Sequence, residues 1–125
     1  MKTLPEEVLQ AWKKKDGAVV FTTVAKDGTP NSIYVTCVEL YEDSKIVIAD
    51  NYFCKTGENI RNGSTAAALF ITGDGKAYQI KGTIDYYDQG ELFDFMKSWN
   101  PTKHPGHGAA VITPDKVYSG AKELN

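Results

Sequence analysis

The stretch KIVIADNYFCKTGENIRNG, residues 45–63, combines three local patterns that together indicate the fold. It opens with an apolar, β-branched run at 45–50, which predicts a buried strand. A polar turn follows, and then a short helix is expected from Thr56 to Asn62, ending at Gly63. Lys55 comes immediately before this helix. We therefore predict a strand that leads, through a tight turn, to a basic side chain at the start of a helix.

Strand patterns surround this stretch on both sides. Two turns, at 26–29 and 73–76, contain an Asp-Gly or Gly-Asp-Gly sequence that tolerates the positive φ of a hairpin. Short strands joined by such turns favour a small barrel over a parallel sheet. Six strands are expected, at 18–25, 31–40, 45–50, 64–72, 77–87 and 109–120, the last of them bent at Pro114.

Two further helices are expected outside the barrel. Each follows a pair with the spacing of a capping box, Thr3 with Glu6 and Asp88 with Glu91. The first helix has one apolar face, made of Leu4, Val8, Ala11 and Trp12. The second carries more apolar surface than one face can bury, from Leu92, Phe93, Phe95, Met96 and Trp99. Because a soluble monomer rarely leaves a large apolar patch uncovered, this surplus favours a dimer.

The composition fits one domain over residues 1–125. Hydrophobic residues make up 42%, and the net charge of −2 gives no reason to expect binding to nucleic acid or to an anionic membrane. Cys37 and Cys54 lack CxxC spacing, which indicates a reducing compartment. We see no signal peptide at the N-terminus and no run long enough to span a bilayer, so we expect a cytoplasmic protein.

Lys55 lies in an unfavourable place unless an anion accompanies it, because a helix N-terminus already carries partial positive charge. Glu58 offsets only part of this charge. A phosphate placed there would receive backbone N–H groups, the Thr56 hydroxyl and the Lys55 ammonium, with Asn59 and Arg61 as further donors. In the alternative interpretation, Lys55 points into water and Thr56 is an ordinary helix cap. The physics of this stretch alone favours neither the phosphate site nor the alternative interpretation.

The order of elements resembles the pyridoxamine 5'-phosphate oxidase-like family of FMN-binding split barrels. The likeness covers most of the chain: an apolar strand, the turn KDGTPN, a strand of alternating apolar residues, the stretch KIVIADNYFCKTGENI and the ending AAVITPDKVYSG. It is greatest to the small single-domain FMN-binding members. The resemblance implies a mainly β fold, a six-stranded antiparallel split β-barrel with peripheral α-helices. It also implies FMN as cofactor and a homodimer with the flavin at its interface.

The resemblance further implies which residues bind the cofactor. Lys55 and Thr56 match residues that hold the FMN phosphate, and Asn59 matches a polar helix residue one turn later. The positions that would line the isoalloxazine ring come from the second and third strands: Tyr34, Val35, Thr36, Ala49, Asp50 and Asn51. Trp99 and the loop 103–108 of a partner chain are candidates to complete each site.

Two departures from the oxidase bear on activity. Cys54-Lys55 stands where the oxidase has Arg-Lys, so one phosphate contact is missing or comes from another residue such as Arg61. The ending KVYSGAKELN has no evident counterpart of the residues by which the oxidase recognises pyridoxal phosphate. This argues against vitamin B6 oxidation.

Three functional classes follow, in the order in which we favour them. The first is a flavin-dependent oxidoreductase or electron-transfer protein. The second is a non-catalytic flavin, deazaflavin or haem binding or sensor module. The third is an interaction domain whose phosphate site is empty. No side chain is an obvious proton donor, so the sequence assigns no catalytic residue, and it names neither the electron donor nor the substrate.

Two other features have a functional and a plain interpretation. Cys54 beside Lys55 could be a redox thiol, but reactivity requires exposure and we favour an incidental turn residue. His104 and His107 could begin a metal site, but no further ligand cluster accompanies them, and we favour a solvated or interface loop. His107 is also a candidate donor to a flavin or a substrate.

Overall fold

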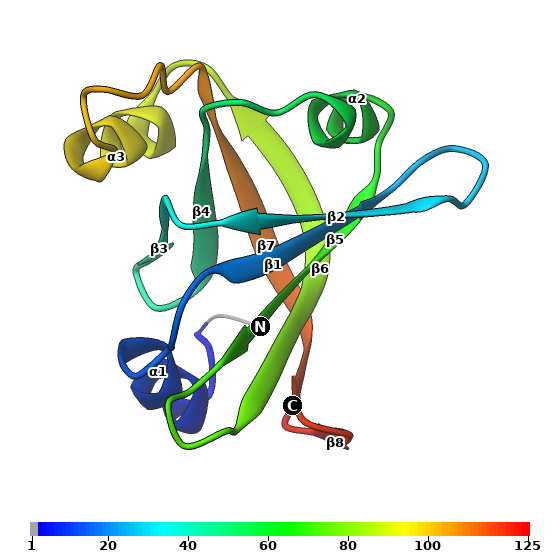
Figure 1. Ribbon diagram of the computed structural model, residues 1–125, viewed down its shortest axis with the longest axis vertical. Coiled ribbons are helices and arrows are strands. Elements are labelled where there is room, and N and C mark those ends of the chain that lie inside the picture. The colour runs from blue at the N-terminus through cyan, green and yellow to red at the C-terminus, as the bar shows by residue number, and fades with distance from the viewer. Residues whose placement is uncertain (1–2) are drawn as a thin grey trace.

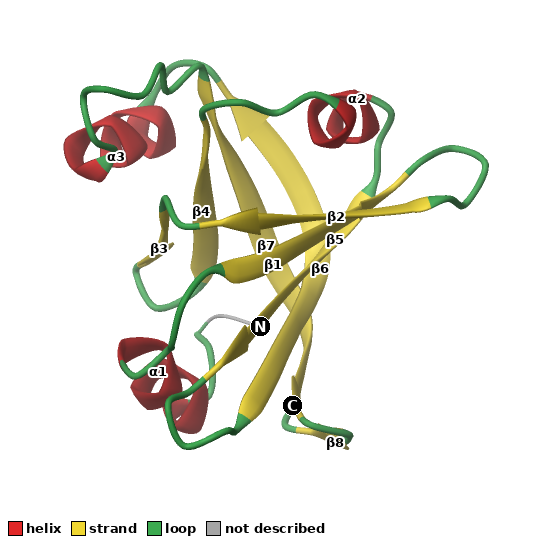
Figure 2. Cartoon of the chain, viewed as in Figure 1, coloured by secondary structure: helices red, strands yellow, loops and turns green. Residues whose placement is uncertain are grey.

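The computed structural model describes residues 3–125, and within them it contains three α-helices and eight strands (Figure 1). In chain order the elements are α1 (Glu6–Lys13), β1 (Val19–Val24), β2 (Pro30–Val35), β3 (Val38–Tyr41), β4 (Lys45–Asp50), α2 (Lys55–Arg61), β5 (Thr65–Ile71), β6 (Ala77–Tyr87), α3 (Glu91–Trp99), β7 (Gly108–Ser119) and β8 (Lys122–Glu123). The strands form one curled sheet, and the helices lie outside it (Figure 2).

The sheet is antiparallel throughout, in the order β2-β1-β5-β6-β7-β4-β3, with the short β8 paired to β7. Its two end strands, β2 and β3, follow one another in the chain. The sheet therefore has to curl until both ends come near the segment that joins them. This confirms the predicted mainly β split barrel.

The predicted strand at 31–40 is two strands, because β2 ends at Val35 and β3 begins at Val38. Both valines are buried, at 8% and 3% exposure. Residues three apart face opposite sides of a regular strand, so the chain has to turn at 36–37 to bury both. The main path of the sheet therefore has seven strands where six were expected.

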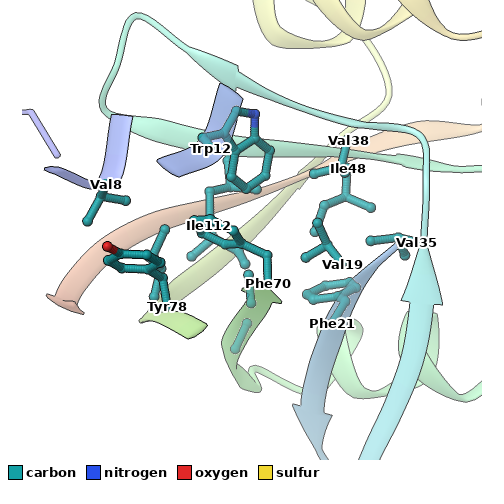
Figure 3. Close-up of a cluster of buried hydrophobic side chains, with 14 of the residues drawn as sticks. Val8, Trp12, Val19, Phe21, Val35, Val38, Ile48, Phe70, Tyr78 and Ile112 are labelled. Carbon is teal, nitrogen blue, oxygen red and sulfur yellow. The ribbon is translucent and has the colours of Figure 1, made fainter. Parts of the chain in front are cut away.

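The barrel interior is filled by large apolar side chains (Figure 3). Phe21, Ile48 and Ile112 are fully buried there. α1 closes one end with Val8 and Trp12, as its predicted apolar face requires.

A second apolar cluster lies on the other face of β4 and β7, where it is covered by Met96 of α3. β4 is therefore buried on both faces, which explains its unbroken apolar run. The aromatic side chains of α3 pack on this sheet, with the ring centroids of Phe95 and Tyr41 4.9 Å apart. Contacts within the same chain therefore cover the apolar side chains of α3, whose number had favoured a dimer in the sequence analysis.

A bulge bends β6 and β7 at the predicted place. Lys81 pairs with Lys116 and Gly82 with Pro114, so that Asp115 has no partner in β6. A Cβ at Gly82 would lie 1.9 Å from the carbonyl oxygen of Thr113. Only glycine fits this close approach of the two backbones.

Helix starts differ from the predicted capping boxes. α1 begins after Pro5 and α3 after Gly90, and neither of these residues makes a side-chain cap. Gly90 has φ 93°, a conformation that glycine adopts without strain. In the part of the chain that the structure describes, no helix is long and apolar enough to cross a membrane.

Candidate functional site

Two hollows lie along β2 and along the segment that leads from β4 into α2. The first, which we call the aromatic groove, has a volume of about 270 Å³ and is lined by Ile33, Tyr34, Val35, Thr36, Cys37, Ala49, Asn51, Tyr52, Phe53 and His104. The second, which we call the lysine hollow, also has a volume of about 270 Å³ and is lined by Ala25, Asp27, Thr29, Pro30, Asn31, Lys55 and Asn59.

The same two segments of the chain contribute to both hollows, although no single residue lines both. Pro30 and Asn31 begin the strand that continues as the groove wall at 33–35, and Lys55 follows the groove residues 51–53 by two positions. At about 3.3 Å per residue, Asn31 and Val35 lie about 13 Å apart along β2. The two hollows therefore lie in a row along β2 and residues 51–55, and we call this row, whose two ends differ in chemistry, the trough.

Asp50 shapes the turn at the end of β4. One carboxylate oxygen accepts the backbone N–H of Phe53 at 3.1 Å, and the other accepts the hydroxyl of Tyr86 at 2.6 Å. Burial of this hydroxyl, together with the bond to Asp50, raises the pKa of Tyr86 well above its ordinary value. The ring of Tyr86 can lie here because residue 108 is glycine, since a Cβ would come within 2.4 Å of the ring. Both oxygens of Asp50 are thus engaged within the protein.

Asn51 anchors the loop that follows α3. Its amide exchanges two hydrogen bonds with the amide of Asn100, at 3.1 and 2.9 Å, and its oxygen also accepts the backbone N–H of Gly106 at 3.0 Å. Asn51 and Asn100 are both buried. This closed network holds the loop against the aromatic groove.

The lysine hollow is built at the first turn of α2, which lies beside the β1–β2 hairpin (Figure 1). The helix begins at Lys55 and its N-cap is Cys54, so the prediction that Thr56 caps the helix is wrong. Thr56 is buried, and its oxygen accepts a hydrogen bond from Asn31 at 3.1 Å, which leaves its own hydrogen for another acceptor. Asn59 is also buried and donates to Thr23 at 3.0 Å.

Charge in the lysine hollow has both signs. The Lys55 side chain is 59% exposed and pairs with Glu58 at 3.2 Å. Asp27 lies across the hollow, and hydrogen bonds from Thr29 lower the pKa of its carboxyl, so that it stays ionised. An anion bound here would have to compete with Glu58 for the ammonium group and approach on the side away from Asp27.

The structure brings most of the predicted site residues together. Tyr34, Val35, Thr36, Ala49 and Asn51 line the aromatic groove, and Lys55 and Asn59 line the lysine hollow. Trp99 lies on α3 in the second apolar cluster, outside both sets of lining residues. Asp50 and Thr56 are also outside both sets.

Several lining residues were missed by the sequence analysis. Tyr52 and Phe53 are in the quoted stretch itself, where two aromatic residues soon after the apolar run at 45–50 were the available signal. His104 belongs to the loop 103–108, which was expected to complete the site of a partner chain, whereas here it lines the groove of its own chain. The Tyr52 hydroxyl and the Nδ1 atom of His104 are 3.1 Å apart. His107 lines neither hollow, and its backbone N–H donates to the carbonyl of Asp50 at 2.9 Å.

The trough can hold a long ligand with an anionic group at one end and a flat, largely apolar group at the other. Lys55 lines the anionic end and provides an ammonium donor there, and the buried Thr56 follows it in α2 outside the lining residues. Tyr34, Tyr52 and Phe53 provide aromatic walls at the other.

Comparisons with known proteins agree with this architecture. The family model described as Pyridoxamine 5'-phosphate oxidase matches residues 5–119. An uncharacterized protein of Methanocaldococcus jannaschii is 32% identical over 123 residues, which cover 93% of this chain and 80% of that protein.

Two solved structures are similar over nearly the whole chain. HupZ of Group A Streptococcus superimposes with a TM-score of 0.82 at 18% identity, covering 98% of each chain. An FMN-binding protein from Syntrophomonas wolfei superimposes with a TM-score of 0.75 at 17% identity, covering 93% of this chain and 84% of the other. At these identities the two structures show a shared fold.

Proposed function

The chain belongs to the pyridoxamine 5'-phosphate oxidase family, and from this premise we propose that it binds FMN in the trough and acts as a flavin-dependent oxidoreductase or electron-transfer protein. One observation carries the proposal. The trough places a hollow lined by Lys55 in line with a groove that has aromatic walls.

The lysine hollow suits the phosphate. Lys55 would move from Glu58 to the phosphate and Thr56 would donate its free hydrogen, while Asn59 holds the helix to β1 through Thr23. Charge-assisted hydrogen bonds of this kind are stronger than neutral ones.

The aromatic groove suits the isoalloxazine ring. β2 is an end strand of the sheet, so every second residue turns its N–H and C=O groups away from β1. Backbone groups near Tyr34, Val35 and Thr36 can therefore meet the polar edge of a ring. When bound, FMN would supply the electron or hydride transfer, and these residues would position it.

We further propose that the protein is a homodimer with the flavin at its interface. Tyr34, Leu69 and Ile71 are 79%, 41% and 46% exposed. Val20 pairs with Tyr34 on one side and with Leu69 on the other, so Tyr34, Val20 and Leu69 form one row across β2, β1 and β5. Ile71 lies two residues after Leu69 on the same face of β5. Tyr34 also lines the aromatic groove, so a partner covering this row would meet the ligand.

If this dimer forms, a charged side chain placed in the row should separate it into monomers. Sedimentation should show a dimer for the wild-type protein and a monomer for Leu69→Asp. A monomeric wild type would contradict the interface and leave the FMN proposal standing.

As the place of action we propose the cytoplasm, because Cys37 and Cys54 are both free thiols.

The test of FMN binding is an absorbance spectrum after reconstitution and desalting. We expect the visible and near-ultraviolet flavin bands at about one flavin per chain. A colourless protein would refute the proposal, and parallel trials with a deazaflavin and with haem would then identify a different ligand. Turnover with NAD(P)H would distinguish an oxidoreductase from a binding module.

A further inference from the structure

Tyr52 and His104 form a hydrogen-bonded pair on the wall of the aromatic groove. The hydroxyl oxygen and Nδ1 are 3.1 Å apart, and the rings meet edge to face with centroids 5.6 Å apart. Tyr52 is 72% exposed, and His104 is half-buried. The pair therefore touches both the groove and solvent.

The pair is held in place by other parts of the molecule. The loop that carries His104 is fixed by the buried amides of Asn51 and Asn100. Lys97 of α3 also donates to the carbonyls of Pro105 and Gly106, at 3.1 and 3.4 Å. An exposed hydrogen bond adds little to stability, and these contacts already fix the loop. The bond between Tyr52 and His104 is thus available for another role.

His104 differs chemically from the rest of the groove. Among the described residues that line it, His104 is the one whose side-chain type ordinarily changes charge between pH 5 and 8. The amide of Asn51 is fully engaged, and Asp50 directs its carboxylate to Phe53 and Tyr86. Of the other titratable or charged groups, Tyr34 and Cys37 line the same groove, and Lys103 and His107 lie in the same loop. On α3, Lys97 bonds to the loop, and Glu91 and Asp94 are in the first turn of the helix. Within residues 3–125, Tyr52 is the side chain that hydrogen-bonds to the His104 ring.

We propose that Tyr52 and His104 form a proton relay that carries a proton between solvent and the ligand in the aromatic groove. This inference rests on the proposed function, because the ligand is the flavin or the substrate bound beside it. It assigns the acid–base group that the sequence left unassigned.

The relay follows from the two directions that one hydrogen bond can take. When His104 is neutral, the Tyr52 hydroxyl donates to Nδ1, and Nε2 carries the ring proton. When His104 is charged, Nδ1–H donates to the Tyr52 oxygen, which frees the phenolic hydrogen for an acceptor in the groove.

Transfer then balances in one step. The ligand takes the phenolic hydrogen, and the Tyr52 oxygen takes the hydrogen from Nδ1. The Nδ1–H bond breaks, one phenolic O–H bond breaks and another forms, His104 becomes neutral with its proton on Nε2, and the acceptor in the groove gains one proton. The proton returns to Nδ1 through the exposed Tyr52 hydroxyl, whose oxygen takes a proton from solvent as its own hydrogen passes to Nδ1.

The first test uses the full chain without flavin. Nitrogen-15 NMR should show the neutral His104 ring as the tautomer protonated at Nε2, and Tyr52→Phe should remove this preference. His107 serves as the internal control and should have the same spectrum in both proteins. An unchanged His104 spectrum in Tyr52→Phe would overturn the proposal.

The second test uses the FMN-loaded protein. Proton uptake after photoreduction of the bound flavin is followed with a pH-indicator dye. We expect His104→Gln and Tyr52→Phe to slow the uptake by about 100-fold, the lower end of the usual acid–base contribution. Added imidazole should restore the rate in His104→Ala, and His107→Gln should match the wild type.

The possible failures are distinguishable. A wild-type protein that takes up no FMN refutes the proposed function, and the relay with it. FMN-loaded His104→Gln with a wild-type uptake rate refutes the relay alone. Variants that lose the flavin would show that the pair holds the ligand instead of moving protons, which also refutes the relay.

Discussion

Reversal of the charge at Lys55 tests the phosphate end of the trough. The side chain is 59% exposed, so an electrostatic contact there is close to that in water. Two unit charges 4 Å apart in water interact by about 1 kcal/mol. Lys55→Glu replaces that attraction by a repulsion of similar size, a total change of about 2 kcal/mol. We therefore expect the Kd for FMN to rise about 30-fold.

The fold should tolerate this substitution. A glutamate in the first turn of a helix interacts favourably with the helix dipole, although here it would also lie near Glu58. Circular dichroism should therefore show unchanged secondary structure. The assay is a titration of FMN fluorescence, which gives the Kd of each folded variant.

Two matched variants control for net charge and for competition. Lys122→Glu makes the same change in net charge on β8, at the other end of the molecule from α2 (Figure 1), and should leave the Kd within twofold of the wild type. Glu58→Gln removes the carboxylate that competes for Lys55, and should tighten binding. A Kd for Lys55→Glu equal to that of Lys122→Glu would refute the reasoning, because the phosphate would then lie elsewhere.

Three further substitutions test the support around the trough. Asn51→Ala leaves the N–H of Gly106 and the amide of Asn100 without their acceptor in a buried place, and should lower the free energy of unfolding in urea by about 3 kcal/mol; a loss below about 0.5 kcal/mol would contradict the network. Gly82→Ala places a Cβ 1.9 Å from a carbonyl oxygen and should abolish folding, as a thermal scan would show by the absence of a cooperative transition. Cys54→Ser should leave the Kd for FMN unchanged, since this exposed thiol lines neither hollow; loss of turnover in this variant would show that the thiol takes part in the reaction.

The sequence predicted best those features that depend on neighbouring residues. The turn at 26–29 and the glycine after α2 were both placed correctly, because Asp-Gly pairs and helix-ending glycines satisfy a local backbone conformation. Gly63 has φ 83°, which explains why the helix stops where it does. Lys55 lines a hollow, but the local chemistry of its stretch left open whether the side chain points into water.

Features that depend on the curvature of the sheet were harder to predict. The alternation over 31–40 looks like one strand, and only the closing of the barrel makes Val35 and Val38 face the same interior. The capping boxes failed for a related reason. Pro5 and Gly90 start their helices through backbone conformation, so Thr3 and Asp88 are not needed as caps.

The pairing of Tyr52 with His104 depends on contacts that no local pattern encodes. The two residues are 52 positions apart, and they meet because the preceding residue, Asn51, bonds to Asn100 from the same loop. Asn51 is buried and Tyr52 is exposed. Asn51 therefore fixes the loop through Asn100, while Tyr52 contacts His104 of the same loop at the groove. A polar residue directly after a buried strand can thus bring a distant titratable group to a binding site. For this reason Asn51→Ala should disturb both the His104 tautomer and the free energy of unfolding, whereas Tyr52→Phe should change the tautomer and leave the free energy of unfolding unchanged.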